Sequence, residues 1–184
     1  MTARSRSRWH GVRMRRTVEA ADPDCAPRAI TLPADWDDAA ASALAAIVPG
    51  EDAIVFGVEA DGWIDRVAAG DADTARALGR LLLAGRAAPL AQTWHGEPLH
   101  GVVLRLSGFT RPGSGFETED YAEALSLLAS LLRARTPADA TPRLLLTDLD
   151  GCLAGLGLDY DSEPARDVAR CLAAAAAAHC DEVA

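Results

Sequence analysis

Three side chains that often bind metal ions lie close together between residues 95 and 100. His95, Glu97 and His100 offer two imidazoles and a carboxylate, which are ligand types of zinc sites. The two histidines are five residues apart, so they lack the i, i+4 spacing of a helical ligand pair, and no cysteine is near them in the sequence. We therefore expect ordinary surface or core histidines and no bound metal.

The cysteines and the missing residue types limit the possible chemistry. Cys25, Cys152, Cys171 and Cys180 show no Cys-x-x-Cys spacing and follow no secretory segment, which favours reduced thiols in a cytoplasm over a disulfide framework. His179 and Cys180 are adjacent, and neighbouring side chains usually point in different directions, which argues against a nucleophile with its base. All 18 basic residues are Arg, and Lys and Asn are absent, so Schiff-base, Walker-type and Cys-His-Asn chemistry are excluded.

Two aspartates follow an apolar run near the end of the sequence. Leu144–Asp150 (LLLTDLD), followed by Gly151, resembles the first motif of haloacid-dehalogenase-type phosphatases. That resemblance implies a phosphohydrolase in which Asp148 attacks phosphorus and Asp150 acts as acid and base, with Mg²⁺ nearby. The family's Lys motif cannot exist as Lys here. The other interpretation is that the aspartates cap the start of a helix.

Charge is distributed unevenly along the chain. The 184 residues carry 18 basic and 27 acidic side chains, a net charge of −9. Residues 1–28 hold seven Arg and three acidic residues, a balance of +4, so residues 29–184 carry −13. We expect residues 1–28 to be a flexible arginine-rich arm, because they lack helical or strand periodicity. The acidic residues 29–184 repel nucleic acids and anionic lipids, so only this arm could bind nucleic acid. No apolar run in the sequence reaches the roughly 18 residues of a membrane span.

Residues 29–184 are predicted to form a single compact α/β or α+β domain of mixed short strands and helices. Asp35 is expected to cap a helix that stops at Pro49. The β-prone run Ile54–Phe56 and the Asp61–Gly62 pair predict a hairpin of two short strands. The later expected elements are a helix capped by Asp71 or Asp73 and ended by Gly85, a strand over Gly101–Ser107, a helix capped by Thr118 and ended by Arg133 and Arg135, and a final helix capped by Asp161 or Ser162.

Several short motifs follow one another between residues 95 and 180. They are GEPL at Gly96–Leu99, GVVLRLSGF at Gly101–Phe109, GFETEDYAEALSLLASLLRA at Gly115–Ala134, LDGCLAGLGLDYDS at Leu149–Ser162 and ARDVARCL at Ala165–Leu172. In order and spacing these motifs resemble one continuous stretch of a ribonucleotide reductase large subunit, most closely the adenosylcobalamin-dependent type. The resemblance implies that this half of the chain folds like a fragment of the reductase α/β barrel.

The residues that perform catalysis in that family are replaced here. The family's active-site loop reads Asn-x-Cys-x-Glu, where Asn holds the substrate, Cys becomes a thiyl radical and Glu is the base. The matching residues are Thr93–Glu97 (TWHGE), in which only Glu97 remains. The imidazole of His95 cannot replace the sulfur radical, and the family's reducing cysteines are also missing.

The resemblance therefore implies a bacterial, cytoplasmic, ribonucleotide-reductase-like domain that has lost catalysis and serves deoxyribonucleotide synthesis and DNA replication through a partner. We expect no catalytic residues, no cofactor and a protein partner bound through an apolar helix face. Two alternatives stay open. One is the Mg²⁺-dependent phosphohydrolase that uses Asp148 and Asp150, and the other is an interaction domain unrelated to reductases.

Overall fold

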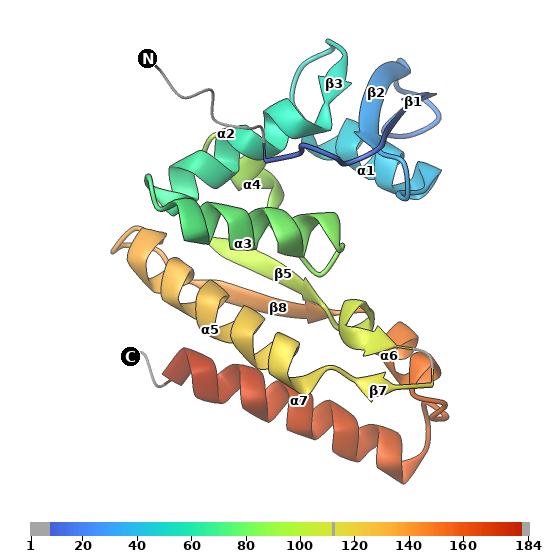
Figure 1. Cartoon of the computed structure of the whole chain (residues 1–184), viewed down its shortest axis with the longest axis vertical. Helices are drawn as coiled ribbons and strands as arrows, with labels where there is room; N and C mark the ends of the chain where they lie inside the picture. Colours follow the sequence, from blue (N-terminus) through green and yellow to red (C-terminus); the bar gives the residue numbers. More distant parts are fainter. Residues whose placement is uncertain (1–7, 112, 182–184) are drawn as a thin grey trace. The chain divides into compact units, whose positions relative to one another are not determined.

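The computed structural model describes residues 8–111 and 113–181. They form a mixed α/β fold of helices and short strands in small sheets, consistent with the predicted α+β class (Figure 1). Instead of the single domain expected over 29–184, the chain divides into two compact units. The N-terminal unit comprises residues 8–79 and 91–97, and the C-terminal unit comprises residues 80–90 and the described residues from 98 onward.

A three-stranded sheet of order β1-β2-β3 lies in the N-terminal unit. Strand β1 (Met14–Glu19) pairs antiparallel with β2 (Arg28–Pro33), which pairs parallel with β3 (Ile54–Val55). The flexible arm expected over residues 1–28 is therefore wrong at β1, while residues 1–7 lie outside the described part. Backbone pairing with β2 orders this strand although its own side chains are mostly polar.

Helix α1 (Asp38–Ile47) packs against β1 and β2. Its cap is Asp37 rather than the expected Asp35, because the Asp37 carboxylate accepts a hydrogen bond of 2.8 Å from the amide of Ala40.

The hairpin predicted around Asp61–Gly62 is wrong, because Phe56–Ala68 form helix α2. The buried side chains of this helix recur at the spacing of one helical face: Phe56, Ala60, Trp63, Ile64 and Val67. That apolar stripe outweighs the turn preference of the Asp-Gly pair, so strand structure is limited to Ile54–Val55.

Helix α3 (Ala72–Leu83) begins as predicted after Asp71. The Asp71 carboxylate accepts hydrogen bonds from the Thr74 hydroxyl at 2.6 Å and the Asp73 amide at 3.0 Å. These bonds, chiefly the one from Thr74, lower the pKa of Asp71. Gly85 follows the helix in the left-handed region with φ +60° and donates its amide to the Leu82 carbonyl, which confirms its expected role as the C-terminal glycine.

The C-terminal unit holds a second sheet of order β4-β5-β8, in which β5 pairs antiparallel with β4 and parallel with β8. Its strands are β4 (Ala87–Pro89), β5 (Gly101–Arg105) and β8 (Arg143–Thr147), and the small hairpin β6 (Thr110–Arg111) and β7 (Gly115–Phe116) follows the 3-10 turn η1 (Leu106–Phe109). The strand predicted over Gly101–Ser107 thus ends at Arg105, and its last two residues belong to η1.

Helix α5 (Thr118–Arg135) connects β5 to β8 and lies alongside α7 (Glu163–Asp181), as Figure 1 shows. The N-cap of α5 is Glu117, so Thr118 is the first helical residue rather than the predicted cap. Helix α7 follows the short α6 (Leu149–Gly155), and Ser162 caps it by accepting a hydrogen bond from the Ala165 amide at 3.2 Å.

Within residues 8–111 and 113–181, no helix combines the length and apolar character needed to cross a membrane.

Candidate functional site

Residues 93–97 lie in and just after helix α4 (Ala91–Trp94), in the N-terminal unit. Thr93 and Trp94 are buried, and the Trp94 ring packs edge-on against Trp63 with 5.9 Å between centroids. His95 and Glu97 are exposed, and His95 Nε2 lies 2.6 Å from the carbonyl oxygen of Ile47. His95 is therefore at the surface, against the chain's own backbone.

The metal ligands considered in the sequence are not gathered into a site. Across the described ranges, no three or more His, Cys, Asp and Glu side chains are placed to hold one metal ion. The adjacent His179 and Cys180 were weighed as a base and a nucleophile. In the structure, His179 Nδ1 lies 2.8 Å from the Ala175 carbonyl oxygen, one turn back in its own helix.

Asp148 occupies a distinctive place in the C-terminal unit, directly after strand β8. Its backbone is left-handed with φ +60°, a conformation that non-glycine residues rarely adopt. The neighbouring parallel strand β5 runs into η1, which carries Ser107, and the Ser107 hydroxyl donates a hydrogen bond to Asp148 Oδ2. The carboxyl ends of two parallel strands are thereby joined by a hydroxyl and a carboxylate.

Gly151 lies against this carboxylate. A Cβ atom at position 151 would collide with Asp148 Oδ1, so a glycine leaves room for the Asp148 side chain over the first turn of α6. Asp150 is exposed in the same turn, whereas Asp148 is half-buried. Both aspartates can be recognised in the LLLTDLD motif, whereas Ser107 belongs to no sequence motif. Its position at the end of a strand parallel to the one before Asp148 was the signal that could have found it.

An ion-pair network holds the turn that carries Ser107. The Arg86 guanidinium donates to the Gly108 carbonyl at 2.8 Å, pairs with Asp120 at 2.6 Å and with Glu117, and stacks 4.7 Å from the Phe109 ring centroid. Arg111 pairs with the other oxygen of Glu117 at 2.6 Å. These contacts tie η1 and β6 to the start of α5.

The four cysteines are all free, as the spacing predicted, with Cys152 buried and the other three exposed. Thr110 Oγ1 lies 3.5 Å from the Cys152 sulfur, beside α6. The Cys25 thiol donates to the Asp22 carboxylate at 3.4 Å, and this hydrogen bond together with the negative charge of Asp22 raises the pKa of Cys25. The structure thus brings no two of these thiols into a disulfide.

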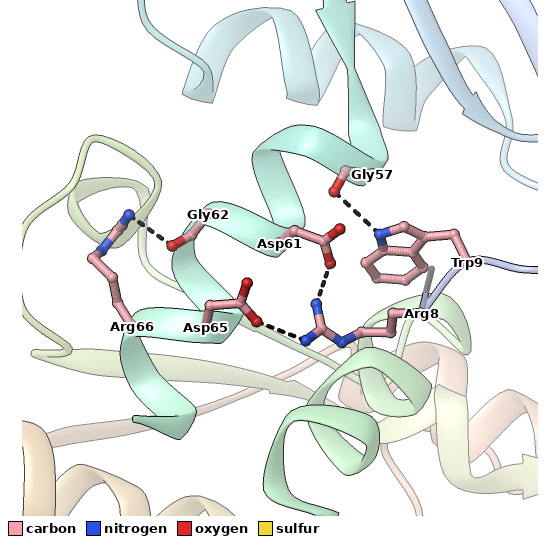
Figure 2. Close-up of polar contacts among 7 residues, drawn as sticks. All are labelled: Arg8, Trp9, Gly57, Asp61, Gly62, Asp65 and Arg66. Carbon is pink, nitrogen blue, oxygen red and sulfur yellow. Dashed lines mark hydrogen bonds and ion pairs between the residues drawn. The ribbon is translucent and has the colours of Figure 1, made fainter. Parts of the chain in front are cut away.

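Residues 8 and 9, which were expected to belong to the flexible arm, are anchored on helix α2 (Figure 2). Arg8 pairs with Asp61 and, at 2.7 Å, with Asp65. The Trp9 indole donates to the Gly57 carbonyl at 3.1 Å, and Gly57 is needed there because a Cβ would lie 2.8 Å from the Trp9 ring. Two carboxylates of this chain therefore offset the charge of Arg8.

Comparisons with protein family models, with curated proteins and with solved structures gave no match.

Proposed function

We propose that this chain is a bacterial, cytoplasmic, ribonucleotide-reductase-like protein that has lost catalysis and acts in deoxyribonucleotide synthesis by binding a protein partner. The resemblance of residues 95–180 is the basis of this proposal. The observation that carries it is the contrast between the core positions and the catalytic positions of that segment.

The core positions of the resembling segment are kept. Leu153, Ala165 and Leu172 are buried in the C-terminal unit. The buried Tyr121 hydroxyl donates to the Leu172 carbonyl at 3.1 Å, which links α5 to α7. The helix, turn and helix that the resemblance implies for residues 149–180 agree with α6, the turn at 156–162 and α7.

The catalytic positions, in contrast, carry no reductase chemistry. His95 stands in the place of the radical cysteine, is exposed, and lies against the Ile47 carbonyl. Hydrogen-atom abstraction by a thiyl radical requires a sulfur atom, so this loop lacks the group that starts the reaction. A protein that keeps its packing residues and loses its reactive groups fits a role in binding.

The surface proposed for the partner is the outer face of α7. Leu172 and Ala176 are buried on its inner face, and the opposite face exposes four alanines, at positions 173, 174, 177 and 178. A face of small alanine side chains supports the proposal of an apolar helix face for the partner, because it would accept a closely packed helix.

Two experiments test the proposal. Incubation of the pure protein with ribonucleotides, adenosylcobalamin and a dithiol should yield no deoxynucleotide, and measurable turnover would overturn the loss of catalysis. The reductase large subunit of the same organism should bind the chain in calorimetry, and Ala174→Glu should abolish that binding. Ala154→Glu, at an exposed alanine of α6, is the matched control and should leave it unchanged. Absence of any complex with the wild-type chain would refute the partner role.

A second candidate function is supported by one observation, the Asp148–Ser107 pair. Ligands of parallel α/β sheets bind beyond the carboxyl ends of the strands, and strained residues gather at functional sites. In a phosphohydrolase, Asp148 would attack phosphorus and Asp150 would protonate the leaving group. The two carboxylates do not form a metal site with a third acidic or histidine side chain among the described residues, so we assign no Mg²⁺ position.

This candidate is separated from the first by hydrolysis of a generic aryl phosphate, measured with and without added Mg²⁺. Asp148→Asn should abolish the activity, and Asp159→Asn, at an exposed aspartate in the next turn, should retain it. A wild-type chain without phosphatase activity would eliminate the candidate and leave the binding role untouched.

A further inference from the structure

Strand β1 forms one edge of the sheet in the N-terminal unit. The order β1-β2-β3 leaves no strand on its outer side among the described residues. A row of its N–H and C=O groups therefore points away from β2, and such an edge can pair with a strand of another chain.

One face of this sheet is open. Ile30, Leu32 and Ile54 are buried on the covered face. On the other face Met14, Val18 and Val55 are 38%, 63% and 44% exposed. These exposed apolar side chains share the face with Arg16 and Thr31, and no described strand or helix buries them.

The charges along β1 indicate which strand fits the edge. Arg13, Arg15 and Arg16 lie at its start, and Glu19 lies at its end, followed by Asp22. Within the described ranges, Arg13 and Arg16 form no ion pair, while Arg15 pairs with Asp38 at 2.9 Å. An antiparallel copy of the same strand would place its acidic end beside this basic start.

We propose that β1 pairs antiparallel with β1 of a second copy of the chain, about a two-fold axis at Thr17, and so joins two sheets into one of six strands. This register sets Arg15 directly opposite Glu19 of the second copy. Arg13 then lies diagonal to that same Glu19. A register about Arg16 would set two guanidinium groups opposite each other, and a one-residue slip would exchange the open and covered faces. The inference does not depend on the proposed function.

The first test measures association of the full chain. Light scattering over a range of concentrations should give twice the mass of the chain. In a background with the exposed Cys25, Cys171 and Cys180 changed to Ser, Thr17→Cys should form an intermolecular disulfide under mild oxidation. Thr31→Cys, on the central strand β2, is the matched control and should remain reduced.

The second test exchanges charges across the axis. Glu19→Arg or Arg15→Glu alone should weaken the dimer by about tenfold, and the two together should restore it to within about threefold of wild type. Circular dichroism of each variant checks that the fold is kept. A wild-type chain that stays monomeric at all concentrations would overturn the proposal. A dimer that neither cross-links at position 17 nor responds to the charge reversals would also overturn it, because it would then form through another face.

Discussion

The hydroxyl of Ser107 and the carboxylate of Asp148 form a hydrogen bond across the ends of two parallel strands. This bond holds the turn after β5 to the start of α6. It also fixes the direction of a carboxylate on a left-handed backbone, where a side chain other than that of asparagine or aspartate would be costly.

Removal of this hydroxyl should therefore weaken the C-terminal unit. Ser107→Ala should lower the free energy of unfolding by about 1–2 kcal/mol, since a hydrogen bond to a charged acceptor is lost and the carboxylate is half-buried. Urea unfolding measures the change. Ser114→Ala, at an exposed serine in the hairpin turn, should have almost no effect. Equal effects of the two variants would show that the Ser107 bond does not contribute.

Gly151 should be sensitive to the smallest substitution. Gly151→Ala should destabilise the protein by about 1–3 kcal/mol, because the new methyl group collides with the Asp148 carboxylate. Asp148→Gly removes that carboxylate and suits the left-handed backbone, so the Gly151→Ala change should cost much less in the Asp148→Gly background. A double-mutant cycle by urea unfolding measures the coupling. If the free-energy changes of Gly151→Ala and Asp148→Gly are additive, the methyl group at position 151 does not collide with the Asp148 carboxylate.

Elements with local signals could be predicted from the sequence. Helix α3 has a capping aspartate, Asp71, before it and a terminal glycine, Gly85, after it. Each of the two makes its hydrogen bonds within a few residues. Arg133 and Arg135 complement the dipole of the helix that they end, as expected. Such features require no information about the rest of the chain.

Features that depend on distant residues could not be predicted in the same way. Strand β1 is ordered by pairing with β2, and its own residues, MRRTVE, show no strand periodicity when they are considered alone. Ser107 and Asp148 are 41 positions apart and meet only because β5 and β8 are parallel neighbours. The hairpin predicted at Asp61–Gly62 is wrong for a different reason, because the apolar stripe along the whole of α2 outweighs the local turn preference of this pair.

Tyr121 should make the free energy of unfolding decrease as the pH rises into the alkaline range. Burial raises the pKa of its hydroxyl from an ordinary value of 10.0 to about 12. The folded state thus holds the proton more tightly than the unfolded state, so the contribution of Tyr121 is complete below about pH 10 and is lost as the pH rises towards 12. Urea unfolding at several pH values should show a decrease of up to about 1.4 kcal/mol per pH unit over this window.

Tyrosine variants identify the source of that dependence. The chain has two tyrosines, and Tyr160 is 60% exposed. Tyr121→Phe should remove most of the decrease between pH 10 and 12, whereas Tyr160→Phe should retain it. A decrease that persists in Tyr121→Phe would assign it to other groups.

Two arginines that share Glu117 should differ in their contribution to stability. Arg86 is 18% exposed and also contacts Asp120, the Gly108 carbonyl and the Phe109 ring, so Arg86→Ala should cost about 1–3 kcal/mol by removing the half-buried ion pair with Glu117 together with these contacts. Arg111 is 67% exposed and pairs only with Glu117 among the described residues, so Arg111→Ala should cost less than about 1 kcal/mol. Urea unfolding in low and high salt distinguishes them, because salt should reduce the small Arg111 effect and leave most of the Arg86 effect. Similar losses for both variants would mean that the network acts through surface charge alone.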